Sequence, residues 1–286
     1  MSFPVLKQES FFISVRYIFE KYFRTFSPIY LTLKTNSVDR KYWETIAPKY
    51  DTEIFDVLQN DVSGSIVSAI EEIASPDKTM IDIGCAIGKW LPVLAPKFKL
   101  VIAADISAKN LLIAKEKYTE YNNVEYQRMD FSADELTVTP CDSAICINAI
   151  LTDSLEKRIN FFQSLSLCLN TGGELVLVVP SLKSKLYTNI IADRWNVDDA
   201  ENDETPTPKD AIQQVSNIKQ GVTNIDNVPT KHYLKEELEL LLTLEGFEVS
   251  LIKKINYGWN TEFHKPPKWL KGPYPWDWMC TARKKK

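Results

Sequence analysis

Between residues 78 and 179 the chain alternates short apolar runs with helix-like stretches, and this alternation limits the possible fold most strongly. Most of the runs contain few polar residues, so we expect helices to cover both of their faces. Strands of this kind are typical of a parallel, doubly wound α/β sheet. The predicted strands cover residues 78–83, 100–104, 124–129, 142–147 and 174–179.

The segments on either side of this alternation predict two further features. Residues 1–60 read as a helical N-terminal extension, and residues 61–286 as the core. Within the core, an insertion of about 181–230 follows the fifth strand. Two more strands, expected to pair antiparallel, are predicted at residues 247–257 and 278–283.

Composition excludes several classes of protein. The net charge of −4 gives no general attraction to nucleic acid or to an anionic membrane. The five cysteines form no CxxC pair and there are two histidines, so we expect no metal ion and no disulfide framework. No apolar run is long enough to span a membrane. We therefore expect a cytoplasmic protein with reduced thiols.

The first predicted strand ends in a glycine-rich loop, residues 82–88, which reads Asp-Ile-Gly-Cys-Ala-Ile-Gly. Small residues between a strand and a helix let a ligand approach the backbone closely. Asp105 ends the next strand, where a carboxylate can accept hydrogen bonds from both hydroxyls of a ribose. Such a loop also occurs as a plain tight turn or in nicotinamide-dependent enzymes. The nicotinamide fingerprint G-x-G-x-x-G is incomplete, because position 89 is Lys.

These motifs together resemble those of the class I S-adenosylmethionine (SAM)-dependent methyltransferases. Residues 82–88 resemble the D-x-G-x-G-x-G motif of that family, with Ala86 in place of the middle glycine. Asp105-Ile106-Ser107 is similar to its acidic second motif, and Met129-Asp130-Phe131 to its third. The resemblance implies a seven-stranded, Rossmann-like methyltransferase sheet with an N-terminal helical lid. It also implies that SAM is the cofactor and S-adenosylhomocysteine the product.

The resemblance also implies a role for each motif residue. Asp105 would hold the ribose hydroxyls, and Asp130 would meet the adenine amino group. Ile106 and Phe131 would contact the faces of the adenine ring. The residues implied for the methionine end and the floor of the site are Asp82, Gly84, Cys85, Ala86, Gly88, Asn148 and Ala149.

Two residues are candidates for work on the methyl acceptor. His232 follows the predicted insertion and could act as a general base, or it could be a histidine bonded to backbone at a helix entrance. Tyr50 lies in an A-x-x-Y-D segment like the one that helps a helical lid close in many small-molecule methyltransferases. A tyrosine packed in the core is the structural alternative.

The acceptor itself is predicted only by class. Residues 148–151 keep the Asn of the N/D-P-P-aromatic motif of base aminomethylases but lack its prolines and aromatic residue. This departure argues against methylation of nucleobase amines. We expect transfer to an O, N, S or C atom of a small molecule. Protein or RNA methylation and an inactive SAM-binding regulatory subunit are the alternatives, and a homodimer is compatible with the sequence.

Overall fold

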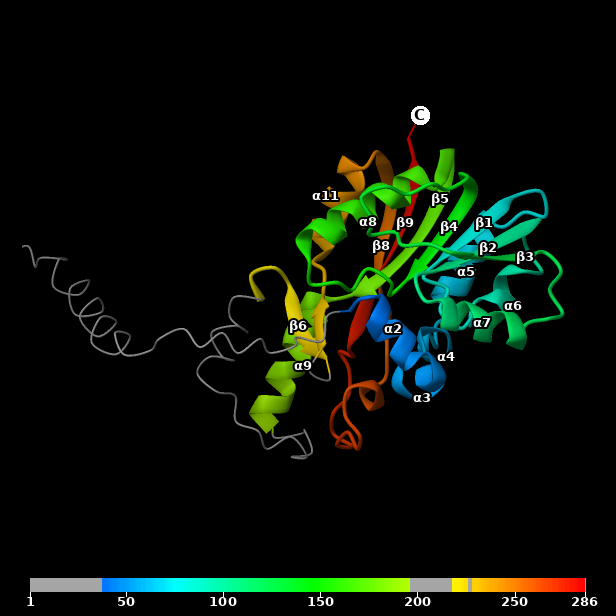
Figure 1. Ribbon diagram of the computed structural model, residues 1–286. Coiled ribbons are helices and arrows are strands. Elements are labelled where there is room, and N and C mark those ends of the chain that lie inside the picture. The colour runs from blue at the N-terminus through cyan, green and yellow to red at the C-terminus, as the bar shows by residue number, and fades with distance from the viewer. Residues whose placement is uncertain (1–37, 196–217, 226–227, 286) are drawn as a thin grey trace, which may run out of the picture. The chain divides into compact units, whose positions relative to one another are not determined.

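The computed structural model describes residues 38–195, 218–225 and 228–285 (Figure 1). The first part of the predicted N-terminal extension, residues 1–37, lies outside these ranges, as do residues 196–217 of the predicted insertion. None of the helices in the described part of the chain combines the length and hydrophobicity needed to cross a bilayer.

Within the described residues, seven strands form one sheet in the order β3-β2-β1-β4-β5-β9-β8. The first five run parallel, and β9 lies antiparallel between β5 and β8. This architecture confirms the doubly wound, seven-stranded sheet predicted from the sequence. The strands are β1 (Thr79–Ile83), β2 (Leu100–Asp105), β3 (Val124–Arg128), β4 (Cys141–Ile147), β5 (Leu169–Pro180), β8 (Phe247–Asn256) and β9 (Trp276–Lys284).

The sheet is apolar on both faces because successive side chains of each strand point to opposite sides. In β5, Leu175 and Leu177 belong to one buried cluster, whereas Val176 and Val178 belong to the other. Helices α8 (Leu155–Leu167) and α11 (Lys235–Leu244) cover the first cluster (Figure 1). The second is covered by α5 (Ser65–Ile73), α6 (Leu91–Leu94) and α7 (Ala108–Lys117).

The topology places one crevice at the carboxyl edge of the sheet. The chain leaves β1 towards β2 and β3 on one side, and then returns to β4 on the other side of β1. At such a point of reversal the loops after the strands separate and leave room for a ligand. The loops that begin at Gly84 and Asn148 therefore lie side by side at this crevice.

The described helices before β1 pack at the same edge. They are α2 (Arg40–Ile46), the 3-10 turn η1 (Ala47–Lys49), α3 (Tyr50–Glu53) and α4 (Val57–Asn60). Helices α3 and α4 are separate, because the Asp56 carboxylate accepts the Gln59 N–H and starts α4 anew. Lys89 pairs with Asp56 at 2.8 Å and with Asp51 at 3.2 Å, which ties these helices to the glycine-rich loop. Their role as a lid stays a prediction.

The described part of the predicted insertion contains structure that the sequence pattern did not indicate. It holds helix α9 (Leu182–Trp195) and the hairpin of β6 (Val222–Ile225) and β7 (Val228–Lys231). The Lys231 N–H donates to the Leu151 carbonyl at 2.9 Å, and the Tyr233 N–H donates to the Pro180 carbonyl at 2.8 Å. These bonds hold His232 above the carboxyl ends of β4 and β5.

Ser63 precedes α5 but is not its N-terminal cap. Gly64 is the N-terminal cap, with a φ of +62°. The Asp61 carboxylate takes the capping role, because it accepts the Ile66 N–H at 2.7 Å and the Ser63 hydroxyl at 2.6 Å. A carboxylate accepts a hydrogen bond from an unpaired N–H at the start of a helix, and its negative charge interacts favourably with the positive end of the helix dipole.

Candidate cofactor and acceptor site

Two adjoining cavities occupy the crevice at the carboxyl edge of the sheet. The small cavity has a volume of about 310 Å³ and the large cavity about 630 Å³. Both are lined by Gly84, Ala86 and Asn148, and by Trp43 and Tyr50 from the N-terminal helices. The loops after β1 and β4 therefore form the common wall at which the two cavities meet.

The glycine-rich loop brings backbone to this common wall. Gly84 has a φ of +73°, and a Cβ placed on it would lie 2.5 Å from the Cβ of Ala149. Ala86 also has a positive φ, 48°, and its N–H donates to Oδ2 of Asp105 at 2.9 Å. Gly88 lines neither cavity; a Cβ there would meet Leu91 at 2.8 Å. Because Gly88 has no side chain, the loop can pack closely against Leu91 in the following helix.

Asp105 ends β2 and lines the small cavity with only 7% of its surface exposed. Its carboxylate accepts hydrogen bonds from the N–H groups of Ala86 and Ser107 and, at 3.4 Å, from the Asn110 side chain. Burial raises the pKa of Asp105, and these donors oppose the rise. A carboxylate can accept about four hydrogen bonds, so capacity for a ligand remains. The sequence analysis did not identify Asn110, whose place one turn into α7 was the available signal.

The residues implied for the adenine, Ile106, Asp130 and Phe131, also surround the small cavity. Asn148 and Ala149, implied for the floor of the site, line it too. Phe131 is buried and packs on Phe161, with ring centroids 5.7 Å apart. Asp130 is exposed, and its Oδ1 accepts from the backbone N–H and the hydroxyl of Ser132 at 2.9 and 2.6 Å. The structure thus brings the three sequence motifs to one cavity.

Asp82 and Cys85 line the large cavity next to the glycine-rich loop. Asp82 is 1% exposed, and its Oδ2 atom has no hydrogen-bond partner within the described residues. Burial, with the charge of Asp105 as the second cause, raises the pKa of Asp82 to about 8. Burial also raises the pKa of the Cys85 thiol, so this thiol stays protonated. The unsatisfied carboxylate oxygen marks a place where a ligand with hydrogen-bond donors would be stabilised.

Tyr50 lines both cavities from the start of α3. Its ring lies 6.3 Å from that of Trp43, and Nζ of Lys89 lies 5.8 Å from its centroid. Burial is the main cause that raises the pKa of the Tyr50 hydroxyl, followed by the charge of Asp105. The phenol is therefore neutral and can donate a hydrogen bond into the site.

His232 lines the large cavity and is 3% exposed. Its Nδ1 lies 3.0 Å from the Thr230 carbonyl, which can only accept, so Nδ1 carries the proton. Nε2 then has a free lone pair, the form required of a general base. Burial lowers the pKa of His232 to about 4. His264, the other histidine, is exposed and lines neither cavity.

The lowered pKa of His232 predicts a loss of stability in acid. Its pKa is about 4 in the folded chain and about 6.5 when unfolded, so the unfolded state binds more protons between these values. Stability from this group is complete above pH 6.5 and falls as the pH approaches 4. The expected loss between pH 7 and pH 5 is about 2 kcal/mol.

Urea unfolding at both pH values measures this loss. His232→Gln should lose about 2 kcal/mol less than the wild type over the same interval. His264→Gln, which changes an exposed imidazole, should behave like the wild type. Carboxylates titrate alike in all three proteins. The difference in the loss of unfolding free energy between His232→Gln and the other two therefore gives the contribution of His232. An equal loss in His232→Gln and the wild type would contradict the assignment.

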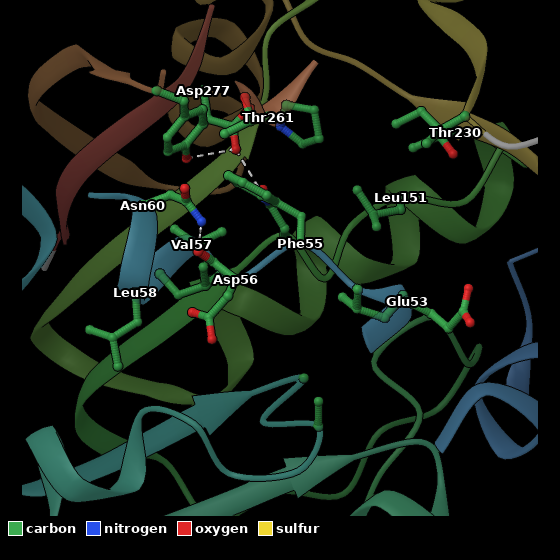
Figure 2. Close-up of a pocket in the computed structure, with 18 of the residues that line it drawn as sticks. Glu53, Phe55, Asp56, Val57, Leu58, Asn60, Leu151, Thr230, Thr261 and Asp277 are labelled. Atoms are coloured by element: carbon green, nitrogen blue, oxygen red, sulfur yellow. Dashed lines mark hydrogen bonds between the residues drawn. The ribbon is translucent and has the colours of Figure 1, made fainter. Parts of the chain in front are cut away.

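A polar group at the start of β9 forms a wall of the large cavity that the sequence analysis missed. Oδ2 of Asp277 accepts from Nδ2 of Asn148 and from the Tyr257 hydroxyl, each at 3.0 Å. Figure 2 shows Asp277 beside Thr261 at one end of the pocket and Glu53 at the other. The available signal was a charged residue at the start of an antiparallel final strand. Such a strand begins where the parallel strands end.

Residues 80–173 match a family model described as a methyltransferase domain. A curated relative, ribosomal RNA small subunit methyltransferase A of Thermotoga maritima, is 27% identical over 166 residues. That alignment covers 56% of this chain and 57% of the relative, so the chain spans little more than half of the relative's length.

Solved structures share the fold across nearly their whole length. Magnesium protoporphyrin IX methyltransferase from Synechocystis, with bound S-adenosylhomocysteine, superposes with a TM-score of 0.54 at 14% identity. The superposition covers 86% of this chain and 97% of that one. The N-methyltransferase NodS from Bradyrhizobium japonicum, with the same compound, has a TM-score of 0.54 at 12% identity and coverages of 86% and 98%.

The matched domain and the sheet order show a methyltransferase domain on a Rossmann-like methyltransferase fold, similar to the class I SAM-dependent methyltransferases. The described residues fit SAM in three respects. The backbone at Gly84 leaves no room for a side chain, and the Asp105 carboxylate has free acceptor capacity in the small cavity. The unpartnered oxygen of Asp82 borders the large cavity, where it could accept from an ammonium group.

Proposed function

We propose that the enzyme methylates a small molecule bound in the large cavity. The observation that carries this proposal is the position and size of that cavity. It adjoins the small cavity at Gly84 and Asn148, and its volume of about 630 Å³ is within the usual range for small-molecule sites. SAM supplies a methyl group already activated by a sulfonium. The protein has mainly to align the acceptor with it and to exclude water.

Under this proposal, the cofactor-binding residues are those that line the two cavities around the glycine-rich loop. Asp105 holds the ribose, and Ile106, Asp130 and Phe131 surround the adenine. Asp82, Cys85 and the backbone at 84–86 face the methionine end. The backbone of Asn148 and Ala149 forms the floor. Gly88 supports the loop by its packing rather than by lining a cavity.

His232 is the proposed general base, and Tyr50 the proposed hydrogen-bond donor next to the cofactor. Both line the large cavity, and His232 is neutral with Nδ1 protonated at neutral pH. Replacing His232 by alanine should lower kcat by about 10²-fold with the Kd for SAM unchanged. Equal losses of turnover and of SAM affinity would instead assign His232 a structural role.

RNA is the second acceptor class to consider, because the curated relative is named a ribosomal RNA methyltransferase. The charges favour a small molecule. The net charge of the chain is −4, and five Asp and Glu side chains against two lysines line the large cavity among its described residues. RNA binding relies on positive charge to meet the phosphates.

Transfer of label from methyl-labelled SAM distinguishes these acceptors. The purified protein is incubated with pooled small-molecule nucleophiles and, separately, with small-subunit ribosomal RNA. We expect label in the small-molecule pools. Label in RNA alone would overturn the proposal. SAM binding without transfer to either would favour an inactive regulatory subunit or a protein acceptor.

A further inference from the structure

Asp277 is a buried carboxylate whose charge is left without an opposite charge. It is 9% exposed, and its partners at 3.0 Å, the Asn148 amide and the Tyr257 hydroxyl, are neutral. Within the described residues, no Lys, Arg or His nitrogen lies within 4.0 Å of its oxygens. Burial raises the pKa of Asp277, and a cation bound at this cavity wall would stabilise its charged form.

The surrounding charges reinforce that of Asp277. Glu262 lines the same cavity from the end of η2 (Trp259–Thr261) with a side chain open to solvent. The pKa of Glu262 is nevertheless raised. Desolvation is the main cause, the charge of Lys185 opposes the rise, and the charge of Asp277 adds to it. Lys89, the other lysine of the cavity, is already paired with Asp56. Negative charge is therefore in excess at this wall.

Aromatic rings border the same wall. Tyr257 packs edge-on against Phe55, with centroids 4.9 Å apart, and both line the large cavity. Trp276, beside Asp277 in β9, also lines it, but Nζ of Lys254 already lies 3.5 Å from the centroid of its ring, so Tyr257 and Phe55 are the rings left for a ligand. Aromatic faces attract cations, and a carboxylate beside them is the combination that binds organic ammonium groups.

We propose that the acceptor carries a protonated amine, which binds against Asp277 with Glu262 and the rings of Tyr257 and Phe55 around it. This inference rests on the proposed small-molecule function and narrows its substrate class. An anionic acceptor would bring further negative charge to a wall that already has an excess of it. Asn148 connects this amine site to the common wall of the two cavities. Its side chain donates a hydrogen bond to Asp277, and Asn148 lines both cavities.

A panel of matched acceptors tests the proposal. Arylalkylamines that carry a ring hydroxyl as the methyl acceptor, their neutral N-acetyl derivatives and hydroxyaryl carboxylates of equal length are each incubated with the protein and methyl-labelled SAM. We expect label in the amines. Label in carboxylates or in neutral compounds, but not in amines, would overturn the amine site and leave the small-molecule function standing. Label in RNA alone, or in nothing, would overturn both.

Asp277→Asn then tests the residue. It keeps the size of the side chain and removes the charge, so KM for the labelled amine should rise at least about tenfold with the Kd for SAM unchanged. Glu262→Gln, at the open side of the cavity, should raise the KM for the amine by a smaller factor. This variant provides the test of the amine site if Asp277→Asn fails to fold. Glu248→Gln, exposed on β8, is the control and should match the wild type. An unchanged KM in both cavity variants would contradict the proposal.

Discussion

Replacing Gly84 by alanine is expected to reduce SAM affinity at least about 100-fold and to destabilise the fold by about 2–5 kcal/mol. The new methyl would lie 2.5 Å from the Cβ of Ala149, in a backbone with a φ of +73°. Neither neighbour can move freely, because the Gly84 N–H is bonded to the Ala104 carbonyl and Ala149 lies two residues after the end of β4. The loop must therefore shift into the space that the methionine end of SAM needs. Calorimetric titration and urea unfolding measure the two effects.

Gly172→Ala is the matched control for this variant. Gly172 has a φ of +79°, and a Cβ there would meet nothing within 4 Å. Its cost should be only that of the backbone conformation, about 1–2 kcal/mol, with the Kd for SAM unchanged. Normal SAM binding by Gly84→Ala, or equal weakening in both variants, would show that the close approach at Gly84 does not shape the cofactor site.

The second large effect is expected for Asp105→Ala. The Kd for SAM should rise about 30- to 150-fold, equivalent to about 2–3 kcal/mol, the scale of charged hydrogen bonds lost from a buried site. The variant removes the proposed ribose acceptor and also leaves the Ala86 N–H, now bonded at 2.9 Å, without its partner. Both losses weaken the wall of the small cavity.

Competition by adenosine and 2′-deoxyadenosine separates the two losses. The wild type should bind adenosine more tightly, whereas Asp105→Ala should bind both alike, because only the ribose contact distinguishes them. Asp77→Ala, an exposed carboxylate in the loop before β1, should keep the wild-type preference. If Asp105→Ala retained the preference for adenosine, Asp105 would be a support of the loop and not the ribose ligand.

The parts of the molecule that the sequence predicted well are those specified by local pattern. Continuous apolar runs identified the central strands, because burial on both faces leaves few polar positions in them. Asp82 near the end of β1 and Asp105 at the end of β2 then marked the ligand edge of the sheet. The close packing of backbone at Gly84 agrees with the small residues of that loop.

The acceptor side depends on contacts between distant parts of the chain, which no local pattern contains. Asn148 and Asp277 are bonded although 129 residues separate them. His232 is buried because the short hairpin of β6 and β7 is bonded to the loop after β4 at Leu151. Four-residue strands give too little alternation to be recognised in the sequence. The break between α3 and α4 was missed because one side chain, Asp56, decides it.

The most direct test of the account is calorimetric titration of the purified protein with SAM and with S-adenosylhomocysteine. The account predicts one site for each compound, with a micromolar Kd, about −8 kcal/mol, that weakens in Gly84→Ala and Asp105→Ala. Absence of binding to both compounds by the folded protein would contradict the assignment of these cavities to SAM.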